Sequence, residues 1–284
     1  MPRQRADEPG TTVPATSSGP APHVSKAAGA LSDAVTRLTG SAAGAAHPDE
    51  EREKTGAAAA LSGVVSGLAA AAKVGGEGAV VSGSFLADLL ITTATRLPLR
   101  DKATLMDQHP DLDTEQLADS LVGAAARVSG AIGAAAGGLA AVQWLATPSL
   151  IAVPVELAAE TLLVAAVELK LVAELHEIYD ARPPGELGDR ATAYLNSWTA
   201  QRGLRGEGQT VGLTSRLASA GTAALRKRIT GRLARNLGSF LPLLAGAVIG
   251  ARNNSSGTRK LSRRLREDLM IAPQRIPSRR IGGA

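Results

Sequence analysis

Residues 128–155, VSGAIGAAAGGLAAVQWLATPSLIAVPV, form a stretch of 28 residues without a charged side chain. That length is sufficient to cross a lipid bilayer as one helix. However, Pro148 and Pro154 interrupt the stretch, and its many Ala and Gly residues favour insertion far less than Leu or Ile would. We therefore expect a central apolar helical hairpin here, and not a single spanning helix.

The first arm of this hairpin begins upstream of the uncharged stretch. Asp113 is a predicted N-cap, with Gln116 placed to reach back to it after Pro110. Two pairs of glycines, each four residues apart, then predict close helix packing, because small side chains let helix backbones approach each other. These glycines are Gly133 and Gly137 in the first arm, and Gly246 and Gly250 in the later apolar segment 238–251.

The second arm, residues 155–179, is apolar over most of its circumference. One face carries charged side chains, namely Glu156, Glu160, Lys170, Glu174 and Glu177. A helix with one acidic stripe and otherwise apolar faces is expected to be deeply packed. Salt bridges from this stripe to the Arg-rich later helices are the favoured interpretation of its carboxylates.

The composition predicts an all-α fold, an Ala/Gly-rich helical bundle. Hydrophobic residues make up 44% of the 284 residues, which is enough for a sizeable core, yet aromatic residues make up only 2% and there are 31 glycines. We expect a disordered N-terminal tail over residues 1–55, with at most a weak helix around residues 25–38. A helical domain is expected over residues 56–252, followed by a basic C-terminal helix and tail over residues 253–284.

Charge is distributed unevenly along the chain. Residues 201–284 contain 17 Lys and Arg against 3 Asp and Glu, a net charge of +14, whereas residues 1–200 carry −9. Such asymmetry predicts that the last third faces an anionic partner, either lipid headgroups or nucleic acid. Apolar helices interleave with the basic residues, and the region lacks aromatic stacking positions and a helix-turn-helix pattern, so headgroups are favoured.

Six residues are the predicted contacts with a membrane or another anionic partner. Tyr194 and Trp198, four residues apart and flanked by arginines, resemble an interfacial anchor, although a peripheral core patch is the commoner fate of such a pair. The cationic members, on a predicted basic amphipathic helix, are Arg226, Lys227, Arg228 and Arg232.

The sequence contains none of the common catalytic signatures. The chain has no Cys and only four His, and it lacks P-loop, dinucleotide-binding, nucleophile-elbow and HExxH motifs. We therefore predict no catalytic, cofactor or metal site and expect a non-enzymatic protein. A carboxylate/His metal-dependent enzyme built on Glu156, Glu160, Glu174 and His176 is a distant alternative, since the segment HEIYD, residues 176–180, only approaches a metal motif.

Two stretches resemble EcsC-family proteins. Residues 117–185, with LADSLVGAAARVSGAIGAAAGG and then VPVELAAETLLVAAVELKLVAELHEIYD, resemble the central part of that family. The later FLPLLAGAVIGARNNSSGTRKLSRRLRED, residues 240–268, is similar to its C-terminal element, in which an Asn/Thr turn separates two helices. Asp180 stands where the family has a turn glycine. The resemblance implies a helical, membrane-associated bacterial protein of unassigned activity, and the Ala, Arg and Gly usage is that of a high-GC organism such as an actinobacterium.

Together these features predict a membrane-associated scaffold or accessory factor without cofactors. The N-terminus MPRQRADEPG has no apolar run after its charges, so we expect a location on the cytoplasmic side of the membrane, with the cytoplasm as the alternative. An anionic membrane surface is the expected partner, a protein partner is an alternative, and nucleic acid is disfavoured. The alternative function is a soluble helical module that binds a partner through the basic C-terminal third.

Overall fold

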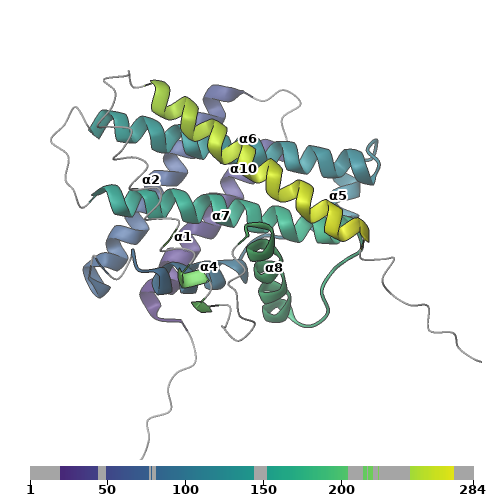
Figure 1. Cartoon of the computed structure of the whole chain (residues 1–284), viewed down its shortest axis with the longest axis horizontal. Helices are drawn as coiled ribbons and strands as arrows, with labels where there is room; N and C mark the ends of the chain where they lie inside the picture. The colour runs from purple at the N-terminus through teal and green to yellow at the C-terminus, as the bar shows by residue number, and fades with distance from the viewer. Residues whose placement is uncertain are drawn as a thin grey trace, which may run out of the picture.

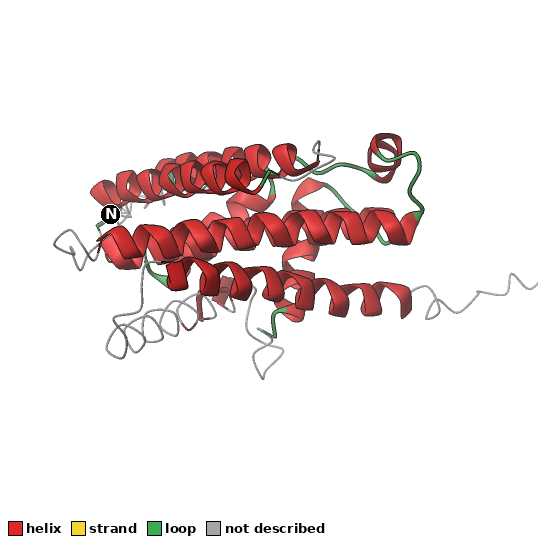
Figure 2. Ribbon diagram, turned by 90° about the horizontal axis from the view of Figure 1, so that it is seen from above, coloured by secondary structure: helices red, strands yellow, loops and turns green. Residues whose placement is uncertain are grey.

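A computed structural model describes residues 20–43, 49–76, 78, 81–143, 152–203, 214–215, 217–219, 223 and 244–271. Over these residues the chain is helical and contains no strand, which confirms the predicted all-α class (Figure 2). The helices are α1 (Pro22–Ala43), α2 (Glu50–Gly75), α4 (Gly83–Ala94), α5 (Lys102–Gln108), α6 (Thr114–Gln143), α7 (Ala152–Ile178), α8 (Leu187–Gln201) and α10 (Leu244–Ile271).

Helix α7 is the centre of the bundle. It contacts each of the other helices named above. Every described side chain from Glu156 to Ile178 is buried except Thr161, which is partly buried. The prediction of a deeply packed helix is thus confirmed, and the burial extends to its charged side chains.

The central apolar hairpin is also confirmed. Helix α6 ends at Gln143 and α7 begins at Ala152, and the two helices run side by side in opposite directions (Figure 1). The predicted capping box begins α6, because the Gln116 backbone N–H donates to the Asp113 carboxylate at 2.8 Å and the Asp113 N–H donates to Gln116 Oε1 at 3.0 Å. At the far end of α7, Asp180 has a φ of 54°, in the left-handed region that favours glycine.

The predicted disordered tail over residues 1–55 is wrong for its second half. Helix α1 spans Pro22–Ala43, and α2 begins at Glu50 with Asp49 as its N-cap. Apolar residues at helical spacing, such as Leu31 and Val35, are fully buried in the common core. Packing against α2 and α4 supplies the stability that the short apolar stripe lacks alone. Residues 1–19 lie outside the described residues.

The predicted boundary between residues 252 and 253 is wrong as well, because α10 runs unbroken from Leu244 to Ile271. The expected Asn/Thr turn at residues 253–258 is helical. Asn254 and Thr258 are buried, and their side chains bond to carboxylates of α7, so tertiary contacts outweigh their weak helix propensity. The basic segment is part of the bundle up to Ile271, and residues 272–284 lie outside the description.

Helices α6 and α10 pack antiparallel and form the most extensive helix pair of the described bundle, with α10 crossing in front of α6 and α7 (Figure 1). A Cβ atom added to Gly133 would lie 2.3 Å from the Gly250 carbonyl oxygen, and one added to Gly250 would lie 2.3 Å from the Gly133 oxygen. The prediction that Gly133 and Gly250 serve helix packing is therefore confirmed. Gly137 and Gly246 stand one turn beyond this crossing, each on its own helix.

Candidate functional site

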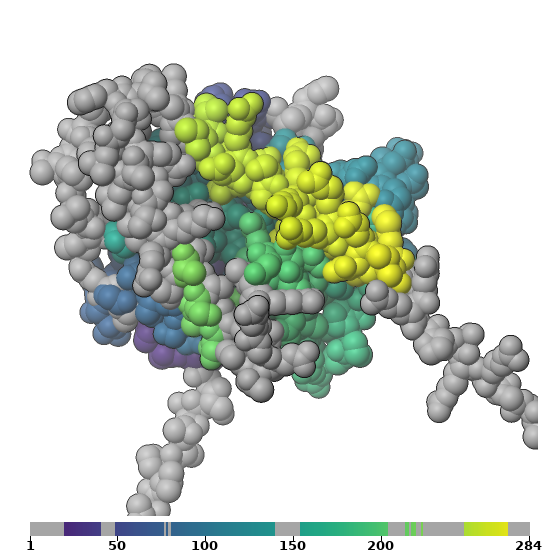
Figure 3. Space-filling model, in the orientation of Figure 1, coloured from purple at the N-terminus to yellow at the C-terminus, as the bar shows by residue number. Residues whose placement is uncertain are grey.

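Helix α10 lies on the surface of the molecule and has two different faces (Figure 3). Leu261, Leu265 and Leu269 are buried against the bundle. At about 100° per residue, the exposed residues fall on the opposite side of the helix. We call this side the α10 outer face, and it comprises Val248, Ile249, Arg252, Asn253, Ser256, Arg259, Lys260, Arg263, Glu267, Met270 and Ile271.

The outer face has a cationic middle and apolar ends. Val248 and Ile249 near the start of α10 are 56% and 40% exposed, and Met270 and Ile271 at its end are 45% and 46% exposed. Among the described residues, none of the four cations Arg252, Arg259, Lys260 and Arg263 forms an ion pair. The first acidic residue along α10 is Glu267, so the cationic middle is uninterrupted.

Buried polar contacts fix the inner face of α10 to α7. Asn254 Nδ2 donates to Glu160 Oε1 at 3.0 Å, and the Thr258 hydroxyl donates to Glu168 Oε1 at 2.8 Å. Glu168 has no exposed surface and also accepts bonds from the Trp198 indole N–H at 3.0 Å and from the Arg202 guanidinium. These bonds set the rotation of α10 about its axis, and therefore which residues face outward.

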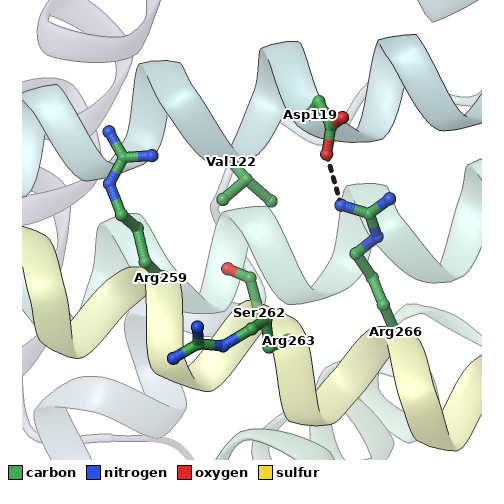
Figure 4. Close-up of a pocket in the computed structure, with 6 residues that line it drawn as sticks. All are labelled: Asp119, Val122, Arg259, Ser262, Arg263 and Arg266. Atoms are coloured by element: carbon green, nitrogen blue, oxygen red, sulfur yellow. Dashed lines mark hydrogen bonds and ion pairs between the residues drawn. The ribbon is translucent and has the colours of Figure 1, made fainter.

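A small cleft opens between α6 and α10. Its volume is about 220 Å³, and it is lined by Asp119 and Val122 of α6 and by Arg259, Ser262, Arg263 and Arg266 of α10. Arg259 and Arg266 extend from α10 toward α6 on either side of Val122 (Figure 4). The lining therefore contains three guanidinium groups and one carboxylate.

Arg266 differs from the other two arginines of the cleft because its guanidinium is fully engaged. It forms ion pairs with Asp119 at 2.5 Å and with Glu115 at 2.5 Å, and its Nε donates to the Tyr179 hydroxyl at 3.0 Å. The Tyr179 hydroxyl in turn donates to Glu115 at 2.9 Å. Arg266 thus neutralises the carboxylate at the edge of the cleft, while Arg259 and Arg263 form no ion pair with any residue that the structure describes.

The acidic stripe of α7 pairs with cations from several parts of the chain. Glu168, which was not among the predicted stripe residues, binds the later Arg202. Glu174 instead accepts two bonds from the earlier Arg100, at 2.8 and 3.0 Å, and pairs with Lys170 one turn away. Burial lowers the pKa of Lys170, although Glu174 opposes this effect. Glu168 was missed by the sequence analysis, although a carboxylate inside an apolar run signals a buried pair.

His176 lies in the interior beside Tyr194, with ring centroids 5.4 Å apart. Its Nδ1 is 2.7 Å from the Val172 carbonyl oxygen, and burial lowers its pKa below the usual 6.5. Among the described residues, no group of three or more His, Asp and Glu side chains is arranged to hold a metal ion. Glu174 is thus bonded to Arg100 and Lys170, and the His176 ring is bonded to the Val172 carbonyl.

The expectation that Tyr194 and Trp198 contact a lipid surface is wrong for this fold. Tyr194 is 3% exposed and Trp198 is 8% exposed. Each ring directs its polar group at a carboxylate of α7, because the Tyr194 hydroxyl donates to Glu177 at 3.2 Å and Trp198 donates to Glu168. Burial and the Glu177 carboxylate raise the pKa of Tyr194 to about 12. The alternative interpretation of the pair, a peripheral core patch, describes what is found.

The other predicted contacts, Arg226, Lys227, Arg228 and Arg232, lie outside the described residues. The structure instead draws attention to the cations of α10, which the sequence analysis placed in a basic C-terminal helix and tail, except for Arg252 in the preceding domain. Their signal was visible in the sequence, because Arg252, Arg259 and Arg263 lie at helical spacing opposite the three leucines.

Two helical segments are long and apolar enough to cross a membrane, namely Glu50–Gly75 and Thr114–Leu139. This is weak evidence of membrane association, since it rests on length and composition. The share of residues buried in the bundle, taken over the most apolar window of each segment, is 61% for Thr114–Leu139 and 33% for Glu50–Gly75. The first of these percentages is typical of a core helix.

Comparison with known proteins identified no relative of this chain. No protein-family model, no curated protein and no solved structure matches this chain.

Proposed function

We propose that this chain is a non-enzymatic protein that associates peripherally with an anionic membrane surface through the α10 outer face. The observation that carries the proposal is the order of side chains along this face. Exposed apolar residues lie at both ends, and between them lie four cations that form no ion pair within the described part of the chain, together with one carboxylate, Glu267. An interfacial helix binds in this way, with apolar side chains entering the boundary region and cations at the headgroups.

The magnitudes support reversible binding. Each Lys or Arg near an anionic membrane contributes about 1 kcal/mol, so the four cations together contribute about 4 kcal/mol. Salt weakens this attraction, because the Debye length falls from about 10 Å at 0.1 M to about 3 Å at 1 M. The exposed side chains of Val248, Ile249, Met270 and Ile271 add a contribution that salt does not screen.

The packing of the bundle favours peripheral binding over insertion. Helix α6 is enclosed by α10, α7 and α2, so it would have to lose these contacts to cross a bilayer. Asn254 and Thr258 hold the other side of α10 to buried carboxylates. The role we propose is a scaffold or accessory factor on the cytoplasmic side, in keeping with the resemblance of residues 117–185 to EcsC-family proteins.

Vesicle sedimentation of the full chain tests this function. We expect the protein to pellet with vesicles that contain phosphatidylglycerol, to remain soluble with phosphatidylcholine alone, and to be released by high salt. The double variant Arg252→Glu/Lys260→Glu should lose most of this binding. Recovery of the wild-type protein in the supernatant at low salt, or its recovery in the pellet after carbonate washing, would contradict peripheral electrostatic binding.

A matched control separates the α10 outer face from net charge. Lys26 of α1 and Lys73 of α2 are exposed, so Lys26→Glu/Lys73→Glu changes the net charge by the same amount elsewhere on the surface. We expect this variant to bind vesicles nearly as the wild type does. Equal losses in the two variants would show that total charge, and not the α10 outer face, governs binding.

A further inference from the structure

We infer that the cleft between α6 and α10 binds a phosphomonoester group, which Arg259 and Arg263 hold. This inference rests on the proposed function and refines it, since it names the headgroup chemistry that the outer face of α10 recognises. It also separates a specific site from the general attraction of a cationic surface.

The charge of the cleft suits a dianion. Its six lining residues include three arginines and one aspartate, which gives a net charge of +2. Arg266 cancels the charge of Asp119 directly through their ion pair at 2.5 Å. The remaining positive charge lies on Arg259 and Arg263, one helical turn apart and without partners among the described residues. A phosphomonoester carries a charge of about −1.5 to −2 at pH 7 and offers three acceptor oxygens.

The donors of the cleft are of the kind that binds phosphate. A guanidinium presents its N–H groups as a planar fork that can bind two oxygens of one phosphate at once. Arg259 extends from α10 toward α6 beside Val122, whereas Arg263, one turn further along α10, directs its guanidinium away from α6 (Figure 4). Arg263 is exposed, so a change of rotamer can bring its guanidinium to the anion that Arg259 holds. Two such forks together can engage all three terminal oxygens, whereas a phosphodiester offers only two.

Ser262 adds a feature that distinguishes protonated from unprotonated anions. Its hydroxyl donates to the Thr258 carbonyl oxygen at 2.8 Å, so toward the cleft it offers only lone pairs. A phosphomonoester that retains one proton, which is common near its second pKa of about 6, can donate to Ser262. Sulfate has no proton to donate at that pH and would leave this oxygen without a partner.

The size of the cleft is sufficient for a headgroup phosphate. A volume of about 220 Å³ corresponds to roughly seven waters at about 30 Å³ each. That space accommodates a phosphate and the first atoms bonded to it. The same chemistry is present in the headgroup of phosphatidic acid and in a free phosphate ester, so the experiment must distinguish these two sources.

The test compares vesicles of equal surface charge that contain either phosphatidic acid or phosphatidylglycerol. We expect the wild-type chain to prefer phosphatidic acid by about tenfold, the effect of one charge-assisted hydrogen bond. Arg259→Gln/Arg263→Gln should reduce this preference to about one.

The control Arg252→Gln/Lys260→Gln removes the same charge outside the cleft lining and should keep the preference while lowering binding to both lipids. Arg259→Lys/Arg263→Lys, which keeps the charge but not the fork, should behave as the Gln pair does in selectivity.

Competition with soluble anions identifies the source of the phosphate. If glycerol phosphate displaces the protein from phosphatidic acid vesicles and sulfate at equal ionic strength does not, the protein recognises the free phosphate group. A preference for phosphatidic acid without such displacement indicates recognition at the membrane.

The outcomes also separate this inference from the proposed function. If the wild-type chain binds both vesicle types equally and calorimetry detects no binding of glycerol phosphate, the cleft inference is overturned while the proposed function stands. Binding of glycerol phosphate that depends on Arg259 and Arg263, without binding to any anionic vesicle, would support the cleft and overturn the membrane function.

Discussion

Gly133 of α6 and Gly250 of α10 meet at the crossing of their helices, and neither position has room for a Cβ atom. The nearest atoms to a Cβ on Gly133 are the carbonyl oxygen and carbon of Gly250, at 2.3 and 2.5 Å. Backbone atoms cannot move aside as the end of a flexible side chain can. The glycine pair therefore sets how closely α10 approaches the bundle, and hence the position of its outer face.

Substitution of Gly250 by Ala should destabilise the protein. The new methyl group overlaps the Gly133 backbone, and overpacking of this kind costs about 1–3 kcal/mol despite the better helix propensity of Ala. Gly63→Ala on α2 is the matched control, because nothing lies within 4 Å of a Cβ at that position. We expect this control to gain up to about 1 kcal/mol of unfolding free energy. Denaturant unfolding followed by circular dichroism measures both, and equal effects would contradict a tight crossing.

Glu168 is the main polar connection between α7, α8 and α10, so its removal should also be costly. Its carboxylate accepts bonds from Trp198, Arg202 and Thr258 with no exposure to solvent. Glu168→Gln leaves the Arg202 charge partly buried without its counterion, which should cost about 2–4 kcal/mol of unfolding free energy. Glu51→Gln, at an exposed pair with Lys54, should change the unfolding midpoint little. Similar midpoints for the two variants would contradict the assigned role of Glu168.

His176 should make the protein sensitive to acid. Burial lowers its folded pKa below 6.5, so the unfolded chain takes up a proton at a pH where the folded chain does not. Stability attributable to this residue is therefore complete above about pH 6.5 and declines as pH falls from there toward the lowered folded pKa. We expect His176→Gln to reduce this decline when urea midpoints are measured across that range. An unchanged difference between variant and wild type at every pH would contradict a neutral, buried imidazole.

Much of the fold follows from local patterns in the sequence. The uncharged stretch with its two prolines predicted the α6 and α7 hairpin, the capping box predicted the start of α6, and the glycine spacing predicted Gly133 and Gly250 at a helix crossing. Each of these features depends on residues close together in the chain, or on steric size alone. They could be recognised without knowledge of the partner helix.

The errors arose where distant partners decide the outcome. The polar run at residues 253–258 has the composition of a turn, but buried bonds from Asn254 and Thr258 to α7 stabilise it as helix. In the same way, Trp198 looks like an interfacial anchor until Glu168 provides a buried acceptor for its N–H. The candidate site was obscured for the same reason, because a continuous α10 is needed to place its cations and exposed apolar residues on one face.

Fluorescence labelling provides the most direct test of the membrane-facing surface. The chain contains no cysteine, so one introduced cysteine is a unique attachment point. Val248→Cys places a probe on the α10 outer face, and Val74→Cys places one at an equally apolar, 72% exposed position on α2. When vesicles containing phosphatidylglycerol are added, we predict that the probe at position 248 becomes protected from a water-soluble quencher and shifts its emission to the blue, while the probe at position 74 stays accessible. Protection at position 74 with continued quenching at position 248 would contradict the account.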